Sequence, residues 1–389
     1  MSPLLTPPRP TDPDSPDTRA LDLEALIKEA RRRTRRRRAA YGAALIAAGA
    51  ALGAFFAFRG GGSSPPGRQG GGPPRGLPAA ATIRGTVPFS TQGTVLFSAR
   101  AGSLFVLVVS PDHARSVAVV RIGRDGATIK KRLAFDQPSF LMDVSAGADG
   151  VYAGTAVVKR FTTRPDELVR IDARTLTVRA RATFPASVAA VEQDGRMWAS
   201  IGDGRVARLD PRTLAIEASQ RVLPAAATAD ESATLSKPAF GMGSVWVLAG
   251  NALHLELVRM DPTSLTVRSR TRVPTGGELS QALNHVAADS RHVYLVGSAL
   301  AAVGADGKLI GRPLVVPGLA NAAIHGSGLV GITANTPTPA LVLLGAGGRI
   351  RARTGLLDAG AGLAVSGQDA WFLGNAGSGN GIVHVRLGR

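Results

Sequence analysis

The chain has 389 residues, a formal net charge of +18 and no cysteine. Without cysteine there is no thiol catalysis, no thiolate metal site and no disulfide bridge, so the folded part must be held together by its own core. This length accommodates two or three ordinary domains or one large all-β domain, and the net charge by itself says nothing about the fold.

The N-terminal 38 residues are predicted to lie in the cytoplasm. Residues 1–20 are rich in proline and aspartate and are predicted to form a disordered tail. In residues 21–38, apolar side chains recur at positions 23, 26, 27 and 30, which is the spacing of one face of an amphipathic helix. The end of this helix is a polybasic run, expected to contact anionic lipid head groups. Its arginines are Arg31, Arg32, Arg33, Arg35, Arg36, Arg37 and Arg38.

Residues 39–58 carry no charge and are predicted to form one transmembrane helix. Twenty helical residues span roughly 30 Å, the thickness of the hydrocarbon core of a bilayer. The basic residues before this segment place the N-terminus in the cytoplasm, and the chain after Arg59 outside. The expected location is therefore the plasma membrane, with a single span. A cleaved signal peptide is the alternative, but a 38-residue charged leader is long and no small-residue cleavage site follows directly.

Gly49 and Gly53 form a G-x-x-x-G pair within the predicted span. Such a pair lets two helices pack closely, so weak dimerisation through this segment is a hypothesis. Residues 59–81 follow as a linker rich in glycine, proline and serine, which is too poor in apolar side chains to form a core.

Residues 82–389 contain a repeated hairpin. Three segments align without gaps, "LVRIDARTLTV" from Leu168, "VARLDPRTLAI" from Val206 and "LVRMDPTSLTV" from Leu257. Each has two alternating strands around an aspartate, followed by proline or alanine and small polar residues. This composition is typical of β-turns, so the aspartates are interpreted as turn formers and not as ligands.

A strand marked by an aromatic residue precedes each hairpin. The marker residues are Phe105, Tyr152, Trp198, Trp246, Tyr294 and Trp371, with Val330 at the equivalent position in the remaining gap. The first five are spaced by 47, 46, 48 and 48 residues, and the seven units average about 44 residues, the length of a four-stranded propeller blade. The fold class is therefore all-β, a seven-bladed β-propeller over 82–389, with six or eight blades as alternatives. The aromatics are interpreted as packing between adjacent blades.

The ends of the repeat predict how the ring closes. The last unit has only three strand-like runs, whereas the first has a spare one at residues 81–87. We expect this N-terminal strand to complete the seventh blade and so remove an exposed sheet edge.

These units resemble those of YVTN, NHL and quinoprotein-like bacterial β-propellers, in which "VYV"-like strands precede "R-hydrophobic-D-P-x-T-L" hairpins. The segments in front of them resemble those of many actinobacterial single-pass membrane proteins. The resemblance implies a fold and no single function, because such propellers include enzymes, sensors and adhesive modules. The Trp-docking pattern A-x-D-x-x-x-G-x-E-x-W of quinoprotein propellers is absent from the sequence, which argues against quinone binding.

No catalytic, cofactor or metal motif stands out in the sequence. The six histidines show no metal-ligand spacing, and neither a nucleophile elbow nor a phosphate-binding loop is present. No catalytic residue, cofactor or metal is therefore assigned. Specific nucleic-acid binding is not expected either, because few aromatics accompany the scattered arginines.

Ligands of propellers usually meet the loops that join the last strand of one blade to the first of the next. The polar residues expected in or beside these loops are Glu231, Lys237, Glu278, Gln281, Asn284, His285 and Asp358. The leading hypothesis is a membrane-anchored extracytoplasmic propeller that binds or scaffolds a protein or cell-envelope polymer. One alternative is a hydrolase or lyase with a metal site dispersed over several blades. The other is a sensor that signals through a partner.

Overall fold

The computed structural model describes residues 79–388 except 89–93, 110–115, 135–138, 149, 158–165, 225–233, 252–253, 274–282, 298, 317, 327, 334–338, 346–348, 357 and 376–379. All of these belong to one compact unit, Arg75–Arg389. In this part of the chain, no helix is long and apolar enough to cross a membrane. The predicted tail, polybasic helix and transmembrane helix, and most of the linker, lie outside the described residues.

The described residues form seven antiparallel sheets, the blades of a propeller. Blade 1 comprises β2 (Thr94–Arg100), β3 (Ser103–Val109), β4 (Ser116–Ile122) and β5 (Thr128–Ala134). Blade 2 comprises β6 (Ser139–Ala146), β7 (Gly150–Val157), β8 (Asp166–Asp172) and β9 (Val178–Phe184). Blade 3 comprises β10 (Val188–Gln193), β11 (Arg196–Ile201), β12 (Arg205–Leu209) and β13 (Ile216–Arg221).

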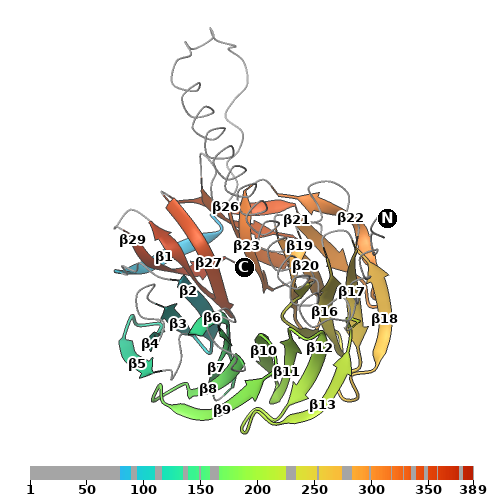
Figure 1. Cartoon of the computed structure of the whole chain (residues 1–389). Coiled ribbons are helices and arrows are strands. Elements are labelled where there is room, and N and C mark those ends of the chain that lie inside the picture. The colour runs from blue at the N-terminus through green and yellow to red at the C-terminus, as the bar shows by residue number, and fades with distance from the viewer. Residues whose placement is uncertain are drawn as a thin grey trace, which may run out of the picture. The chain divides into compact units, whose positions relative to one another are not determined.

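Blade 4 has a split inner strand, with β14 (Thr234–Leu235) and β15 (Ala239–Gly241) both pairing with β16 (Ser244–Gly250), followed by β17 (Leu255–Met260) and β18 (Val267–Arg272). Blade 5 comprises β19 (Leu283–Ala288), β20 (Val293–Gly297), β21 (Ala299–Val303) and β22 (Leu309–Val315). Blade 6 comprises β23 (Leu319–His325), β24 (Gly328–Thr333), β25 (Ala340–Leu344) and β26 (Ile350–Gly355). Figure 1 shows the blades arranged as a ring with the first strand of each blade innermost.

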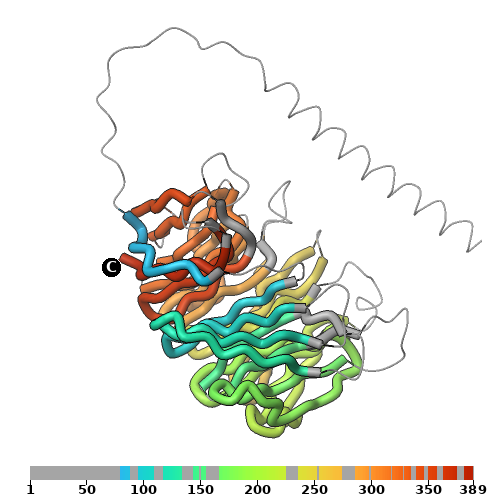
Figure 2. The backbone as a smooth tube through the Cα atoms, turned by 90° about the vertical axis from the view of Figure 1, so that its left-hand side faces the viewer, coloured from blue at the N-terminus to red at the C-terminus, as the bar shows by residue number. Residues whose placement is uncertain are grey.

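Blade 7 is built from both ends of the described chain. It comprises β27 (Asp358–Ser366), β28 (Asp369–Asn375), β29 (Asn380–Leu387) and, as its outer strand, β1 (Ala81–Pro88). The pairing of β1 with β29 runs from Ala81 opposite Leu387 to Pro88 opposite Gly381, and Figure 2 shows the blue N-terminal strand beside the red C-terminal ones. The predicted closure of the ring by the N-terminal strand is confirmed.

The core is divided into seven clusters, each made by two neighbouring blades. One cluster joins Phe105 of blade 1 to Val144 and Val151 of blade 2, and another joins Trp371 of blade 7 to Val106 of blade 1. All six marker aromatics lie in the second strand of their blade and are at most 4% exposed. The sequence-based interpretation of these residues as inter-blade packing is confirmed. Because each cluster needs two blades, no blade can bury its apolar faces alone.

The three repeated hairpins share one turn. In the first, the Asp172 Oδ1 accepts hydrogen bonds from the backbone N–H groups of Arg174 at 2.9 Å and Thr175 at 2.8 Å, and Asp210 and Asp261 do the same in theirs. These bonds hold the pKa of each carboxyl below its usual range. The aspartates therefore form turns, as the sequence indicates.

Each of these turns also places a leucine in the left-handed region of backbone space. The φ angles of Leu176, Leu214 and Leu265 are 53°, 64° and 59°, and each side chain is buried in an inter-blade cluster. A non-glycine residue is strained there, and burial of the side chain offsets that strain. The sequence analysis did not predict this conformation, because leucine carries no signal for it.

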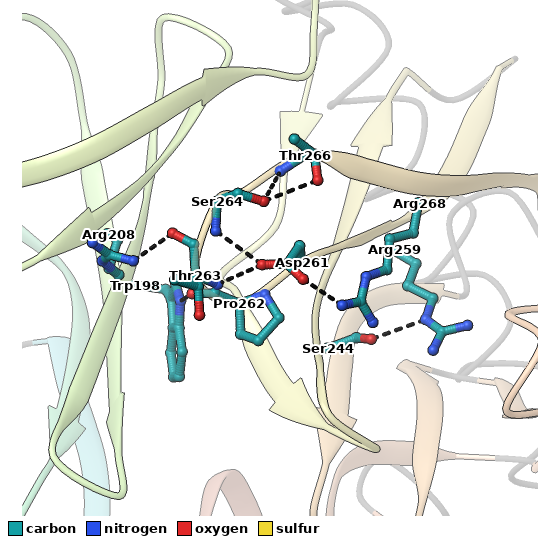
Figure 3. A network of polar contacts seen from close by, with 10 residues as sticks. All are labelled: Trp198, Arg208, Ser244, Arg259, Asp261, Pro262, Thr263, Ser264, Thr266 and Arg268. Atoms are coloured by element: carbon teal, nitrogen blue, oxygen red, sulfur yellow. Dashed lines mark hydrogen bonds and ion pairs between the residues drawn. The ribbon is translucent and has the colours of Figure 1, made fainter.

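Side chains of one blade bind backbone carbonyl groups in the hairpin turn of the next. The Trp198 Nε1 of blade 3 donates to the Pro262 carbonyl of blade 4 at 3.1 Å, and Arg208 donates to the Thr263 carbonyl beside it. Figure 3 shows this network together with the Arg268 ion pair to Asp261. In blade 2, the Tyr152 hydroxyl makes the corresponding bond to blade 3. The repeat thus stabilises the ring as well as each sheet.

The alternation of strand direction gives the ring two different faces. The hairpin face carries the turns between the first and second strands of each blade and, in blades 1 to 6, those between the third and fourth strands. The loop face carries the connections between second and third strands and those between blades. No hairpin-face connection exceeds six residues, whereas the loop-face connection from β13 to β14 has twelve, Val222 to Ala233.

Candidate functional site

The structure describes the side chains of two of the seven sequence-predicted candidates, Lys237 and His285. Asn284 is the second residue of β19 and Asp358 the first of β27, so both begin inner strands at the loop face; only their backbone is described. The other three, Glu231, Glu278 and Gln281, lie outside the described residues. The candidate site is therefore built from Lys237 and His285 and the groups around them.

Lys237 precedes β15 and reaches past blade 3 to blade 2. Its Nζ lies 2.9 Å from the Asp143 Oδ1 and donates to the Val144 carbonyl at 2.8 Å, both in β6. The second carboxylate oxygen of Asp143 accepts the Ala190 N–H from β10 at 3.2 Å. Three successive inner strands thus meet at one carboxylate, because Lys237 is long enough to span the intervening blade.

The ion pair is partly enclosed. The side chain of Asp143 is 17% exposed and that of Lys237 is 31% exposed. Burial raises the pKa of the Asp143 carboxyl, and the charge and hydrogen bond of Lys237 oppose that rise without cancelling it. Contacts from two other blades, the Lys237 ammonium and the Ala190 N–H, favour its charged form and so limit that rise.

His285, on the inner strand β19 of blade 5, lies in the electrostatic field of the same lysine. Burial lowers the pKa of its imidazole, and the positive charge of Lys237 lowers it further, while a hydrogen bond to the backbone of Ala322 in blade 6 acts in the opposite direction. The imidazole is therefore neutral at neutral pH. The charge of Lys237 thus acts on a residue 48 positions away that was predicted from a different loop.

Lys237 and Asp143 form an ion pair between blades 4 and 2, with His285 in the electrostatic field of the lysine, and we call these three residues the axial cluster. Shifted pKa values of this kind are frequent at functional sites but also occur in structural networks. Lys237 has three N–H donors, of which two serve Asp143 and Val144. The cluster can supply polar contacts to a ligand. Within the described residues, no three His, Asp or Glu side chains come close enough together to hold a metal ion.

Sequence reasoning missed Asp143. It lies within the strand "SFLMDVSA", where no motif marks it. The available signal was a single charge in the middle of an otherwise apolar inner strand, which requires a partner in the fold. That partner is 94 residues away, so local patterns do not reveal it.

A second buried carboxylate lies at the hairpin end of the inner strands. Glu192 accepts hydrogen bonds from the Gly195 N–H at 2.9 Å and from the Ala148 N–H of blade 2, and Arg100 of blade 1 lies 3.6 Å from it. Its side chain is only 2% exposed. Glu192 is therefore a tie between blades 1, 2 and 3 and is not accessible to a ligand.

Comparisons with known proteins identify the fold. No family model matches the chain, and no curated protein matches it. Among solved structures, BamB from Moraxella catarrhalis is 14% identical with a TM-score of 0.52. The Cps50 (Swd1) β-propeller domain of Myceliophteria thermophila is 12% identical with a TM-score of 0.54. Each match covers 79% of this chain and 100% of the other. The chain is a seven-bladed β-propeller. At this level of identity the likeness extends to the fold alone.

Proposed function

We propose that the chain is a single-pass membrane protein that displays its propeller outside the cytoplasm and uses the loop face to bind a partner. The partner is a protein or a cell-envelope polymer. The anchor and its orientation rest on the sequence of residues 21–58. The propeller supplies a rigid platform, because every blade packs against both of its neighbours.

The loop face is the proposed binding surface because the two faces of the ring differ. The hairpin face is occupied by short turns whose carbonyl groups bind the neighbouring blade. The N-terminal strand also begins at the hairpin face, where the Gly388 N–H donates to the Ala80 carbonyl at 2.9 Å. The loop face is remote from this point of attachment and has the longer connections, which is where binding residues of a rigid scaffold concentrate.

Photo-crosslinking in living cells tests this proposal with the full chain. A photoreactive amino acid is placed at Pro224, exposed on the loop face, or at Asp125, exposed in a hairpin-face turn. We expect a covalent adduct of defined mass from the Pro224 variant and none from the Asp125 variant. The same adduct from both positions, or none from Pro224 and from further loop-face positions, contradicts the proposal.

Protease treatment of intact cells tests the orientation separately. We expect the propeller to be digested from outside while the N-terminal tail is protected. A tail that is cut while the propeller survives shows that the orientation is reversed.

A further inference from the structure

A pocket of about 560 Å³ opens between blades 3 and 4 on the loop face. Its apolar wall includes Val222, Leu223 and Ala249, which are at most 7% exposed, and the exposed Pro224 beside them. Its charged wall includes Arg221 and Arg270, one from the fourth strand of each of the two blades, and Glu256 from the third strand of blade 4.

The two arginines differ in their ion-pair and hydrogen-bond partners. Arg270 is paired with Glu256 at 2.9 Å, and its second Nη donates to the Val222 carbonyl at 2.9 Å. Arg221 donates to the Asp203 carbonyl at 2.6 Å, and among the described residues it pairs with no carboxylate. The positive charge of Arg221 is therefore available at a pocket whose wall is partly apolar.

Comparison of the repeated hairpins shows that blade 3 lacks the glutamate–arginine ion pair that blades 2 and 4 have. In blades 2 and 4, a glutamate on the third strand pairs with an arginine on the fourth, Glu167 with Arg181 at 3.1 Å and Glu256 with Arg270. In blade 3, the glutamate position is occupied by Arg205 and the arginine position by serine.

Arg205 lies directly opposite Arg221 across the strand pair. Like charges at opposed positions are destabilising. The Asp203 carboxylate offsets one of the two charges, because it binds Arg205 at 2.7 Å. Among the described residues, Arg221 has no carboxylate partner, so an anionic ligand can pair with it.

We propose that this pocket binds an acidic peptide segment of a partner protein, in which a carboxylate meets Arg221 and a neighbouring apolar side chain packs on the exposed ring of Pro224. A polyphosphate or an acidic polysaccharide satisfies the charge but has no apolar side chain for this wall, so a peptide is the better match. The inference rests on the proposed use of the loop face for binding and names its ligand class.

The test measures peptide binding to the full chain in lipid nanodiscs by fluorescence anisotropy at physiological salt. The probe is a fluorescein-labelled hexapeptide of alternating leucine and aspartate, and the comparison peptide replaces aspartate with lysine. We expect R221Q to weaken binding of the acidic peptide by about tenfold, the effect of one charge-assisted contact. The polybasic run is the same in all variants and therefore does not contribute to the difference.

R181Q is the matched control. It makes the same arginine-to-glutamine change on the fourth strand of blade 2, where Arg181 lines no part of this pocket, so its binding is expected to equal that of the parent. A second variant, R205E, introduces opposite Arg221 the glutamate that blades 2 and 4 carry at this position, and it is also expected to weaken binding. Unchanged melting temperatures of the variants exclude misfolding as the cause.

Three results overturn the inference. The first is that R221Q binds the acidic peptide within twofold of the parent, and the second is that the lysine peptide binds the parent as tightly as the acidic one. The third is that polyphosphate displaces the peptide fully from the parent but not from R221Q, because this indicates a general anion site. Photo-crosslinking at Pro224 separates the two proposals. An adduct that persists in R221Q means that the loop face binds a partner but Arg221 does not select it, whereas no adduct in the parent contradicts the proposed function itself.

Discussion

The contact between blades 3 and 4 and the contact that closes the ring between blades 7 and 1 use the same aromatic position differently. Trp198 stacks on Phe240 of the next blade, with ring centroids 4.8 Å apart, and donates its Nε1 hydrogen bond to Pro262 there. Trp371 is equally buried but stacks on His384 of its own blade, at 4.9 Å. Among the described residues, its Nε1 has no acceptor.

The difference follows from the turn that each tryptophan meets. Blade 4 presents an Asp-Pro turn, whose carbonyl groups face blade 3. Blade 1 has the sequence "GRDGA" at 123–127 in the equivalent place, and its Arg124 instead binds Asp369 of blade 7 at 2.7 Å. Asp369 in turn binds His384 at 3.1 Å. Packing of a large aromatic is therefore general to the ring, whereas the polar contact beside it depends on the local turn.

Removal of the strand that closes the ring is expected to have the largest effect on the stability of the propeller. Deletion of residues 81–90 removes β1 and exposes the edge of β29, so blade 7 and both of its neighbours lose support. We expect loss of cooperative thermal unfolding for the whole propeller. Removal of ten linker residues, 61–70, is the control and is expected to leave the transition unchanged. A sharp transition at the parental temperature in the β1 deletion contradicts the assigned closure.

The second prediction concerns the ion pair of the axial cluster, which joins blades 4 and 2 across blade 3, and its contribution to the free energy of unfolding. K237M leaves the Asp143 carboxylate without its cation, and we expect a loss of about 2–4 kcal/mol in the free energy of unfolding, measured by urea titration. The double variant with Asp143→Leu removes both charges and is expected to recover most of that stability. Additive losses in the double variant mean that the two side chains do not interact.

The smallest effect is expected from a matched pair of tryptophan substitutions. W198F and W371F remove the same volume from buried positions, but only the first removes a hydrogen bond. W198F is therefore expected to lower the free energy of unfolding by about 1 kcal/mol more than W371F, measured in the same denaturant series. Equal losses show that the bond to Pro262 contributes nothing to stability.

Much of the fold could be predicted because the repeat depends on residues that are close together in the sequence. The spacing of residues such as Tyr152 and Trp198 indicated the number of blades, and the spare strand at 81–87 indicated how the ring closes. The aspartate turns were recognisable because a turn depends on a few adjacent residues. The left-handed leucines were not, because burial in the assembled ring, and not residue type, makes that conformation acceptable.

The candidate site was predictable only in part. Lys237 and His285 were chosen as polar residues beside inter-blade loops, and the charge of the lysine lowers the pKa of the histidine in the structure. The partner of Lys237 was missed, and so was the role of Arg221. In both cases the decisive neighbour lies on another blade or another strand.

The sequence by itself determined the repeat, the turn chemistry and the aromatic packing positions, because each of these is a property of one hairpin. Only the tertiary structure decided that Lys237 ties blade 4 to blade 2 and that Arg221 stands at a pocket between blades 3 and 4. The physical reason is the closed ring. It sets blades side by side in an order that the chain encodes, while the side chains that meet across them depend on reach, burial and charge in three dimensions.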